Sequence, residues 1–204
     1  MKYYPFGKPI LNSSRYLKDF QSILKSGRLV HGKNIEKFEN SFAKYTNAKS
    51  AISVSSCTTG MTLFYHSIGI KSGDEIILPS QTHVATAHAI MASGAKPIFI
   101  DSDKFSGNID LEKISKKITS RTKAITVVHY LGNPVDMEAV MTLSKKHNLF
   151  VLEDCALALG AKYKNKHVGL IGDAGFFSFY PVKHITTGEG GMIILNNTKY
   201  EKKL

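Results

Sequence analysis

Cysteine and tryptophan are nearly missing from this sequence of 204 residues, which contains two cysteines and no tryptophan. Cys57 and Cys155 stand far apart and neither has a second thiol nearby, so we expect both to be reduced and predict neither a zinc ribbon nor a disulfide framework. The closest histidines, His83 and His88, are five positions apart, which does not place both rings on one helical face. The sequence therefore predicts no metal site.

Long apolar runs are also missing. No stretch reaches the roughly 18 uninterrupted apolar residues of a membrane span, and the N-terminal residues 1–5 lack the apolar run of a secretory signal. We therefore expect no membrane association and a cytoplasmic location.

Acidic residues are few, because 16 Asp and Glu stand against 27 Lys and Arg, which gives a net charge of +11. The lysines lie in short polar segments, such as 113–123 and 162–166, rather than along one helix with interleaved aromatic side chains. This distribution favours solvated faces over a nucleic-acid interface, so no nucleic-acid partner is predicted.

Apolar and polar segments alternate along most of the chain. From about residue 50 onward, short apolar runs are separated by longer segments of helical period, the pattern of βα units around a parallel sheet. We predict an α/β fold with a mostly parallel seven-stranded sheet flanked by helices. The expected strands are 51–54, 75–78, 97–100, 124–128, 150–153, 174–179 and 191–195, and the expected helices are 58–69, 82–93, 110–118 and 136–147.

Two further amphipathic helices are predicted upstream, over 13–25 and 35–45. The second carries Ile35, Phe38, Phe42 and Tyr45 at helical spacing, which indicates core contacts. We expect residues 1–48 to form a helical segment that packs on a large domain of residues 49–204. The polar end of the chain looks like the start of a further element and indicates truncation at the C-terminus.

The most informative segment runs from residue 175 to residue 191. An expected strand delivers Ser178, a turn at Pro181 follows, and Lys183 then projects from a glycine-rich loop. Most lysines are simply solvated, but a lysine that bonds an aldehyde must be held on rigid backbone and lose part of its water. We expect the aromatic residues of 176–180 to supply that setting, which makes Lys183 a candidate Schiff-base lysine.

Two other segments suit a phosphorylated aldehyde cofactor. The carboxyl ends of parallel strands line a binding crevice, which is where Asp154 is expected, and pyridoxal phosphate needs a carboxylate against its ring nitrogen. An acid at a strand end is otherwise a helix cap. Residues 55–60 place small hydroxyl side chains between a strand and a helix, which suits a phosphate or serves ordinary N-capping.

The hydroxyl-rich segment 55–60, which suits a phosphate, is followed along the chain by Asp154 and then by Lys183. With these features in this order, the chain resembles the DegT/DnrJ/EryC1/StrS family of sugar aminotransferases over nearly its whole length. This resemblance implies pyridoxal phosphate as cofactor and the large domain of a fold type I transferase. The specific motif is Ser178-Phe179-Tyr180-Pro181-Val182-Lys183, followed by Thr187-Gly188-Glu189-Gly190-Gly191. Supporting motifs lie at 26–32, 55–59, 73–80, 84–86, 129–134 and 153–154.

The resemblance implies a role for each matching residue. Lys183 falls on the Schiff-base lysine, which also moves the proton during transfer, and Asp154 falls on the partner of the pyridine nitrogen. Thr58 and Thr59 fall on the phosphate-binding turn, to which Ser178 adds a hydroxyl.

One further site residue and two departures also follow from the resemblance. His83 falls where family members stack an aromatic ring on the cofactor. Cys57 stands where glycine is common, and its side chain crowds the turn slightly. Leu157 stands where glutamine is common, so an amide contact to the ring hydroxyl of the cofactor would be lost.

The implied reaction moves an amino group from an amino acid, with glutamate expected, to a keto group of a nucleotide-linked sugar in amino-sugar or polysaccharide biosynthesis. A perosamine-type transfer to C4 is expected, by a homodimer if the protein is complete. Family chains continue into a small C-terminal domain that is absent here. Two alternatives stay open: a related sugar dehydratase, which carries histidine at the lysine position, and a truncated non-catalytic or regulatory protein that binds the cofactor or a sugar.

Overall fold

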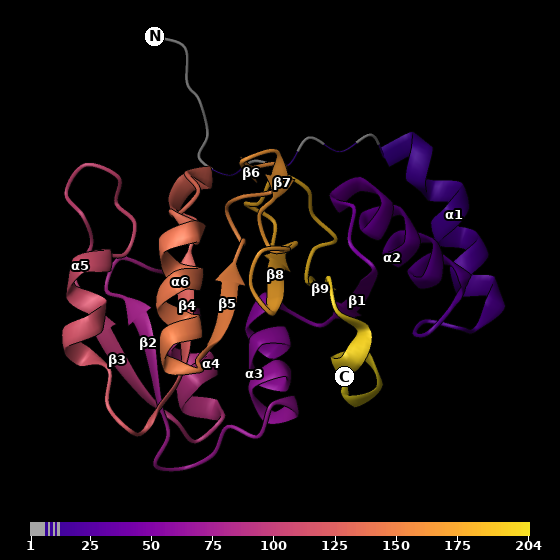
Figure 1. Ribbon diagram of the computed structural model, residues 1–204. Coiled ribbons are helices and arrows are strands. Elements are labelled where there is room, and N and C mark those ends of the chain that lie inside the picture. The colour runs from indigo at the N-terminus through magenta and orange to yellow at the C-terminus, as the bar shows by residue number, and fades with distance from the viewer. Residues whose placement is uncertain (1–6, 8, 10, 12) are drawn as a thin grey trace, which may run out of the picture.

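A seven-stranded sheet with the strand order β1-β9-β8-β5-β4-β2-β3 forms the centre of the computed structural model, which describes residues 7, 9, 11 and 13–204 (Figure 1). Neighbouring strands are parallel except at β9, which is antiparallel to both β1 and β8. The strands are β1 (Ser50–Val54), β2 (Glu75–Pro79), β3 (Lys96–Ile100), β4 (Thr122–Val128), β5 (Phe150–Asp154), β8 (Ala174–Ser178) and β9 (Gly191–Leu195). The predicted α/β fold is confirmed.

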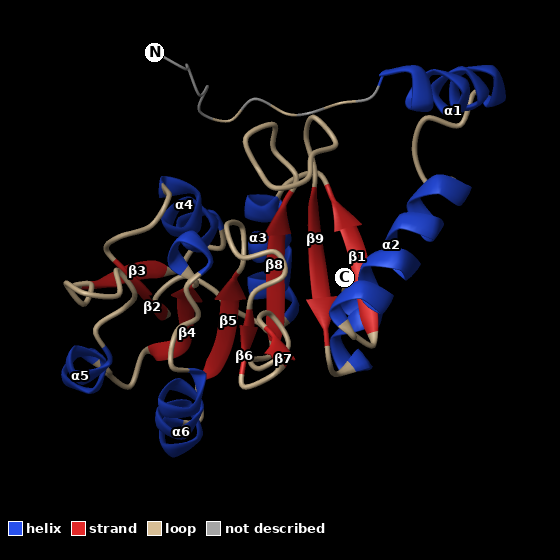
Figure 2. Ribbon diagram, turned by 90° about the horizontal axis from the view of Figure 1, so that it is seen from above, coloured by secondary structure: helices blue, strands red, loops and turns tan. Residues whose placement is uncertain are grey.

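Helices cover both faces of this sheet (Figure 2). One face carries α3 (Cys57–Ser67) and α4 (Val84–Ala92), and the other carries α2 (Lys33–Thr46), α5 (Leu111–Ile114) and α6 (Met137–His147). Short 3-10 turns follow at Ser115–Lys117, Tyr130–Gly132 and Thr198–Lys203. Within the described part of the chain, no helix combines the length and the apolar character that crossing a bilayer requires, and residues 1–5, whose composition argued against a signal, lie outside that part.

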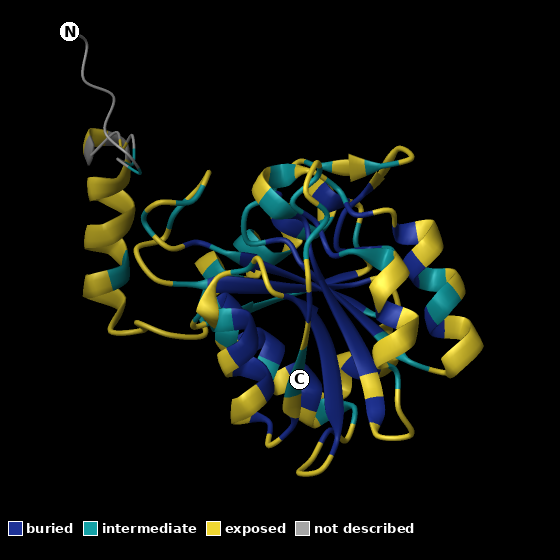
Figure 3. Cartoon of the chain, turned by 90° about the vertical axis from the view of Figure 1, so that its left-hand side faces the viewer, coloured by how far each residue is buried: buried dark blue, intermediate teal, exposed yellow. Residues whose placement is uncertain are grey.

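The core follows from the two-residue period of the strands. Along β2, Ile76 and Leu78 belong to the apolar cluster under α3 and α4, whereas Ile77 between them belongs to the cluster under α5 and α6. All three side chains are fully buried, as expected for a parallel sheet covered on both faces. Figure 3 shows the buried strands between helices whose outer sides are exposed.

The N-terminal helices differ in how they contact this body. Phe42 on α2 is buried and packs edge-on against Phe177 and Phe179 of the β8 region, at centroid distances of 5.1 and 5.6 Å. Tyr45 is 61% exposed, so its expected place in the core is wrong. On α1 (Ser13–Ser26) most large apolar side chains are exposed, namely Tyr16, Leu17, Phe20 and Leu24. The division of the chain at residue 48 stays a prediction.

A small hairpin was not expected from the sequence. It consists of β6 (Lys162–Tyr163) and β7 (Lys166–His167), joined by Lys164 and Asn165, which both have positive φ angles of 46° and 66°. A two-residue loop with this geometry matches the twist of a hairpin. The segment carries no alternating apolar pattern, which is the signal that would have predicted strands.

Candidate active site

The register of the sheet brings the predicted site residues to one edge. Gly191, the first residue of β9, pairs with Val54 at the end of β1 and with Ser178 at the end of β8. Asp154, the last residue of β5, pairs with Val128 at the end of β4. The carboxyl ends of the parallel strands and the start of β9 therefore share one edge, where the loops carrying the other candidates begin.

The hydroxyl-rich segment forms a cup at the start of α3. Ser56 caps the helix by accepting a hydrogen bond from the Thr59 N–H at 3.1 Å, and the Thr59 hydroxyl contacts those of Ser55 and Ser56 at 3.2 and 2.9 Å. Among the described residues, the N–H groups of Cys57 and Thr58 have no hydrogen-bond partner. Free N–H groups and the positive end of the helix dipole make this cup suitable for a phosphate.

Gly191 makes the cup compact. A Cβ atom at this position would lie 2.5 Å from both the Cys57 nitrogen and the Ser56 carbonyl carbon. Both neighbours are backbone atoms that a side-chain rotation cannot move away. Glycine is therefore needed where β9 passes the start of α3.

Gly191→Ala is expected to lower the free energy of unfolding by about 1–3 kcal/mol, the usual range for overpacking a tight site. Urea denaturation followed by circular dichroism would measure the loss. Gly32→Ala is the matched control, because a Cβ there meets nothing within 4 Å and the backbone has an ordinary φ of −123°. Equal stability of the Gly191→Ala and Gly32→Ala proteins would contradict the close approach.

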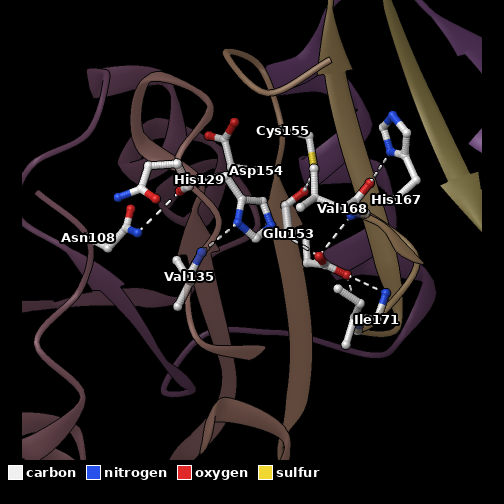
Figure 4. A network of polar contacts seen from close by, with 12 residues as sticks. Asn108, His129, Val135, Glu153, Asp154, Cys155, His167, Val168 and Ile171 are labelled. Atoms are coloured by element: carbon white, nitrogen blue, oxygen red, sulfur yellow. Dashed lines mark hydrogen bonds and ion pairs between the residues drawn. The ribbon is translucent and has the colours of Figure 1, made fainter. Parts of the chain in front are cut away.

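Asp154 is a buried carboxylate, 6% exposed, at the end of β5. Its Oδ1 accepts a hydrogen bond from the Ala156 N–H at 3.0 Å, and its Oδ2 accepts one from the Thr86 hydroxyl at 2.8 Å. Figure 4 shows its side chain pointing away from that of Glu153, as consecutive strand residues do. No cationic side chain of the described residues forms an ion pair with it.

Lys183 lies in the loop between β8 and β9, partly buried, where its N–H donates to the Tyr180 carbonyl at 2.9 Å. The buried thiol of Cys57 connects it to the other candidates. Burial raises the pKa of Cys57, the charge of Asp154 raises it further, and the charge of Lys183 lowers it. The charges of Asp154 and Lys183 therefore both bear on the pKa of the thiol at the start of the cup.

The aromatic residues near Lys183 have a different role from the expected one. Phe176 packs against Phe64 of α3, and Phe177 packs against Phe42 of α2. Both are buried in the core on opposite faces of β8. They fix the strand that leads to the lysine, and the expectation that they surround its amine is wrong.

Three other candidates occupy the rim of the site. His83 is exposed and caps α4, since its Nδ1 accepts from the Ala85 N–H at 3.2 Å. Ser178 is partly buried, and its hydroxyl accepts from the Tyr180 N–H at 3.4 Å. Leu157 is partly buried and offers no polar side-chain atom. No group of three or more potential metal ligands occurs within the described residues.

A buried network beneath this edge was missed in the sequence (Figure 4). Glu153 is fully buried. Its Oε2 accepts hydrogen bonds from the His129 ring at 3.0 Å and from the Gly169 N–H at 2.8 Å. Its Oε1 accepts hydrogen bonds from the N–H groups of Ile171 and Gly172 at 2.7 and 2.6 Å. The His129 Nδ1 accepts from Val135, so its Nε2 carries the proton given to Glu153. The network ties the exit of β4 to loop 168–172.

His167 extends this region and predicts a pH dependence. Burial lowers the pKa of its imidazole, whose Nδ1 lies 2.6 Å from the Val168 carbonyl while its Nε2 accepts from the Gly160 N–H at 3.1 Å. His167 takes up a proton near pH 6.5 in the unfolded chain and only at lower pH in the folded protein. The stability that comes from keeping His167 neutral is therefore present above about pH 6.5, and it is lost as the pH falls toward the folded-state pKa.

The expected slope is at most about 1.4 kcal/mol of unfolding free energy per pH unit from this residue. Urea denaturation of the wild type and of His167→Gln between pH 7.5 and pH 5.5 would measure it. The variant should lose less stability over this interval than the wild type does. Parallel pH curves for the two proteins would contradict the prediction.

Comparisons with known proteins agree with this geometry. GDP-perosamine synthase of Escherichia coli O157:H7 is 44% identical over 100% of this chain and 56% of its own length. The structure of Helicobacter pylori PseC, an aminotransferase involved in the biosynthesis of pseudoaminic acid, matches with a TM-score of 0.91 and 37% identity over 99% of this chain and 54% of that one.

A third match is the Escherichia coli GDP-4-keto-6-deoxy-D-mannose-3-dehydratase, solved with bound hydrated PLP, with a TM-score of 0.89 and 32% identity over 98% of this chain and 53% of that one. This chain thus spans a little over half the length of each of these proteins. The model of the DegT/DnrJ/EryC1/StrS aminotransferase family matches residues 12–204, which confirms the resemblance predicted from the motifs. The chain belongs to the DegT/DnrJ/EryC1/StrS aminotransferase family.

Proposed function

We propose that the protein of which this chain forms the cofactor-binding part is an aminotransferase that uses pyridoxal phosphate to transfer an amino group, with glutamate as donor, to a nucleotide-linked keto-sugar in amino-sugar or polysaccharide biosynthesis. One observation carries the proposal. The sheet register brings the strand end before the α3 cup, Asp154 at the end of β5 and the start of the loop that carries Lys183 to one edge of the sheet, which supports a common site for the three groups that this cofactor needs.

The residues present fit the cofactor. The cup offers two free N–H groups, those of Cys57 and Thr58, together with hydroxyl groups for a phosphate. Asp154 accepts two hydrogen bonds, whereas a carboxylate has about four acceptor positions, so it can also accept from a ring N–H. Lys183 forms no ion pair with an acid of the described residues, which leaves its amine available.

Pyridoxal phosphate supplies an electron sink for the bond changes at the amino acid and sugar carbons. The α3 N-terminus, Thr58, Thr59 and Ser178 would hold the phosphate, and Asp154 would keep the ring nitrogen protonated. The Lys183 amine would hold the aldehyde carbon and, when released, accept and return the proton at its Nζ. His83 would cover one face of the ring from the rim of the site.

Two further observations support the substrate and the homodimer. The 44% identity to a GDP-perosamine synthase favours a nucleotide-linked keto-sugar aminated at C4. Around the site edge, several large apolar side chains are 43% or more exposed, which suits a second copy packing over this edge. These residues are Val84, Leu131, Tyr180, Val182 and Ile185.

Absorbance spectroscopy tests the proposal. The purified chain mixed with pyridoxal phosphate should develop the visible band of lysine-bound cofactor, L-glutamate should bleach the band with release of 2-oxoglutarate, and a GDP-linked 4-keto-sugar should restore it. Mass spectrometry would then detect the aminated sugar. No visible band would overturn the proposed function.

The same experiment separates the two alternatives. A band that does not respond to any amino donor would indicate a non-catalytic cofactor-binding protein. Loss of a hydroxyl from the sugar without amination would indicate a dehydratase, as in the 32% identical neighbour. Lysine, rather than histidine, at residue 183 favours transamination over that reaction.

A further inference from the structure

A chain of two hydroxyl groups leads to the candidate ring-nitrogen acid. Thr86, in the first turn of α4, is fully buried and donates to the Asp154 Oδ2 at 2.8 Å. Its Oγ1 also lies 2.8 Å from that of Thr82, in the loop before the helix. Thr86 and Asp154 are 68 positions apart in the sequence, so only the fold brings them together.

The direction of these two hydrogen bonds follows from the number of hydroxyl protons available. A threonine hydroxyl has one proton to donate. Thr86 uses its proton on Asp154, so the second contact must run from the Thr82 hydroxyl to the Thr86 oxygen. Donation from Thr82 polarises the Thr86 hydroxyl and strengthens its bond to the carboxylate.

The surroundings of Asp154 make this bond important. The carboxylate is buried without a cationic partner in the part of the chain described, and such a charge depends on hydrogen bonds and local dipoles. Thr86 brings the only side-chain hydrogen bond recorded for Asp154 within that part, and α4 brings the positive end of its dipole. The Ala156 N–H is the second donor.

We propose that Thr86 is a positioning residue, oriented by Thr82, which holds the Asp154 carboxylate in the orientation that accepts a hydrogen bond from a protonated ring nitrogen. The inference rests on the proposed function. Since Thr82 directly precedes His83, the two hydrogen bonds couple the segment that carries His83 to Asp154. Without Thr86, one acceptor side of Asp154 would lose its donor.

The test uses pyridoxal phosphate labelled with ¹⁵N in the ring, bound to the wild type and to Thr86→Val, Thr86→Ser and Thr82→Val. Valine keeps the shape of threonine but has no hydroxyl. We expect Thr86→Val to move the ring ¹⁵N resonance toward that of an unprotonated pyridine and to weaken cofactor binding about 10- to 100-fold. Thr86→Ser should restore both, and Thr82→Val should change both in the same direction by less.

Thr126→Val is the matched control. Thr126 is also fully buried, but its hydroxyl bonds Tyr65 at 2.7 Å instead of Asp154. The Thr126→Val substitution should reduce the stability of the protein and leave the ring ¹⁵N resonance unchanged. A wild type that shows no lysine-bound cofactor would refute the proposed function itself. A wild type that binds, together with a Thr86→Val protein of unchanged resonance and affinity, or a Thr126→Val protein with an equal shift, would overturn the role of Thr86.

Discussion

Replacing Lys183 with alanine is expected to abolish the visible band of bound cofactor and to reduce amino transfer by a factor of about 10²–10⁴ or more, because alanine can neither bond the aldehyde nor move a proton. The band would be followed by absorbance spectroscopy after gel filtration. Transfer would be followed by the formation of 2-oxoglutarate from glutamate in single-turnover reactions.

Two further variants test whether the amine of Lys183 is needed as a nucleophile or only as a positive charge. Lys183→Arg keeps the cation but is not a usable nucleophile, because the guanidinium stays protonated, and it should behave like Lys183→Ala. Lys166→Ala removes an exposed lysine of the β6–β7 hairpin, outside the candidate site, and should behave like the wild type. A full visible band in Lys183→Ala would show that another amine holds the cofactor.

Glu153→Gln is expected to lower the free energy of unfolding by about 2–6 kcal/mol. Each carboxylate oxygen of Glu153 accepts two hydrogen bonds from the buried network. An amide has one oxygen and one NH₂ group, so in either orientation two N–H donors face another donor, at about 1–3 kcal/mol for each unsatisfied group. The loss is a large share of the roughly 5–15 kcal/mol by which a domain is stable.

Urea denaturation of the folded fraction would measure this loss, with Glu138→Gln as the matched control. Glu138 is exposed and pairs with Lys164 on the surface, so its replacement should change stability little. If Glu153→Gln is isolated only as unfolded chain, the prediction is met at its upper end. A stability equal to that of Glu138→Gln would show that the network contributes little.

Local patterns predicted most of the fold. Short apolar runs located all seven strands of the sheet. The signal is clearest in the middle of the sheet, where a parallel strand buried on both faces is apolar along its length, as Ile76, Ile77 and Leu78 of β2 are. The spacing of Phe38 and Phe42 predicted the buried side of α2. The polar hairpin at 162–167 escaped prediction because its two-residue strands have no apolar side to reveal them.

The site was predictable only in part. The order of the cup, Asp154 and Lys183 could be read from the sequence because each follows a recognisable strand. The partners of Asp154 and Glu153 could not, because Thr86 lies 68 positions before its acid and Gly169 lies 16 positions after Glu153, and no local pattern encodes such contacts. Thr86 lies in the motif 84–86, but the sequence could not show that its hydroxyl bonds Asp154, because only the position of α4 brings the two residues together.

The place of β1 in the sheet has a consequence for biosynthesis. β1 has a single neighbour in the sheet, β9, and its Ser50 pairs with Leu195. During translation the chain leaves the ribosome at about 5–20 residues per second, so the strand that leads into the phosphate cup has no pairing partner until nearly the whole of this chain has been made. Contacts so distant in sequence form slowly. The nascent protein should therefore acquire its affinity for the cofactor late, when β9 enters between β1 and β8.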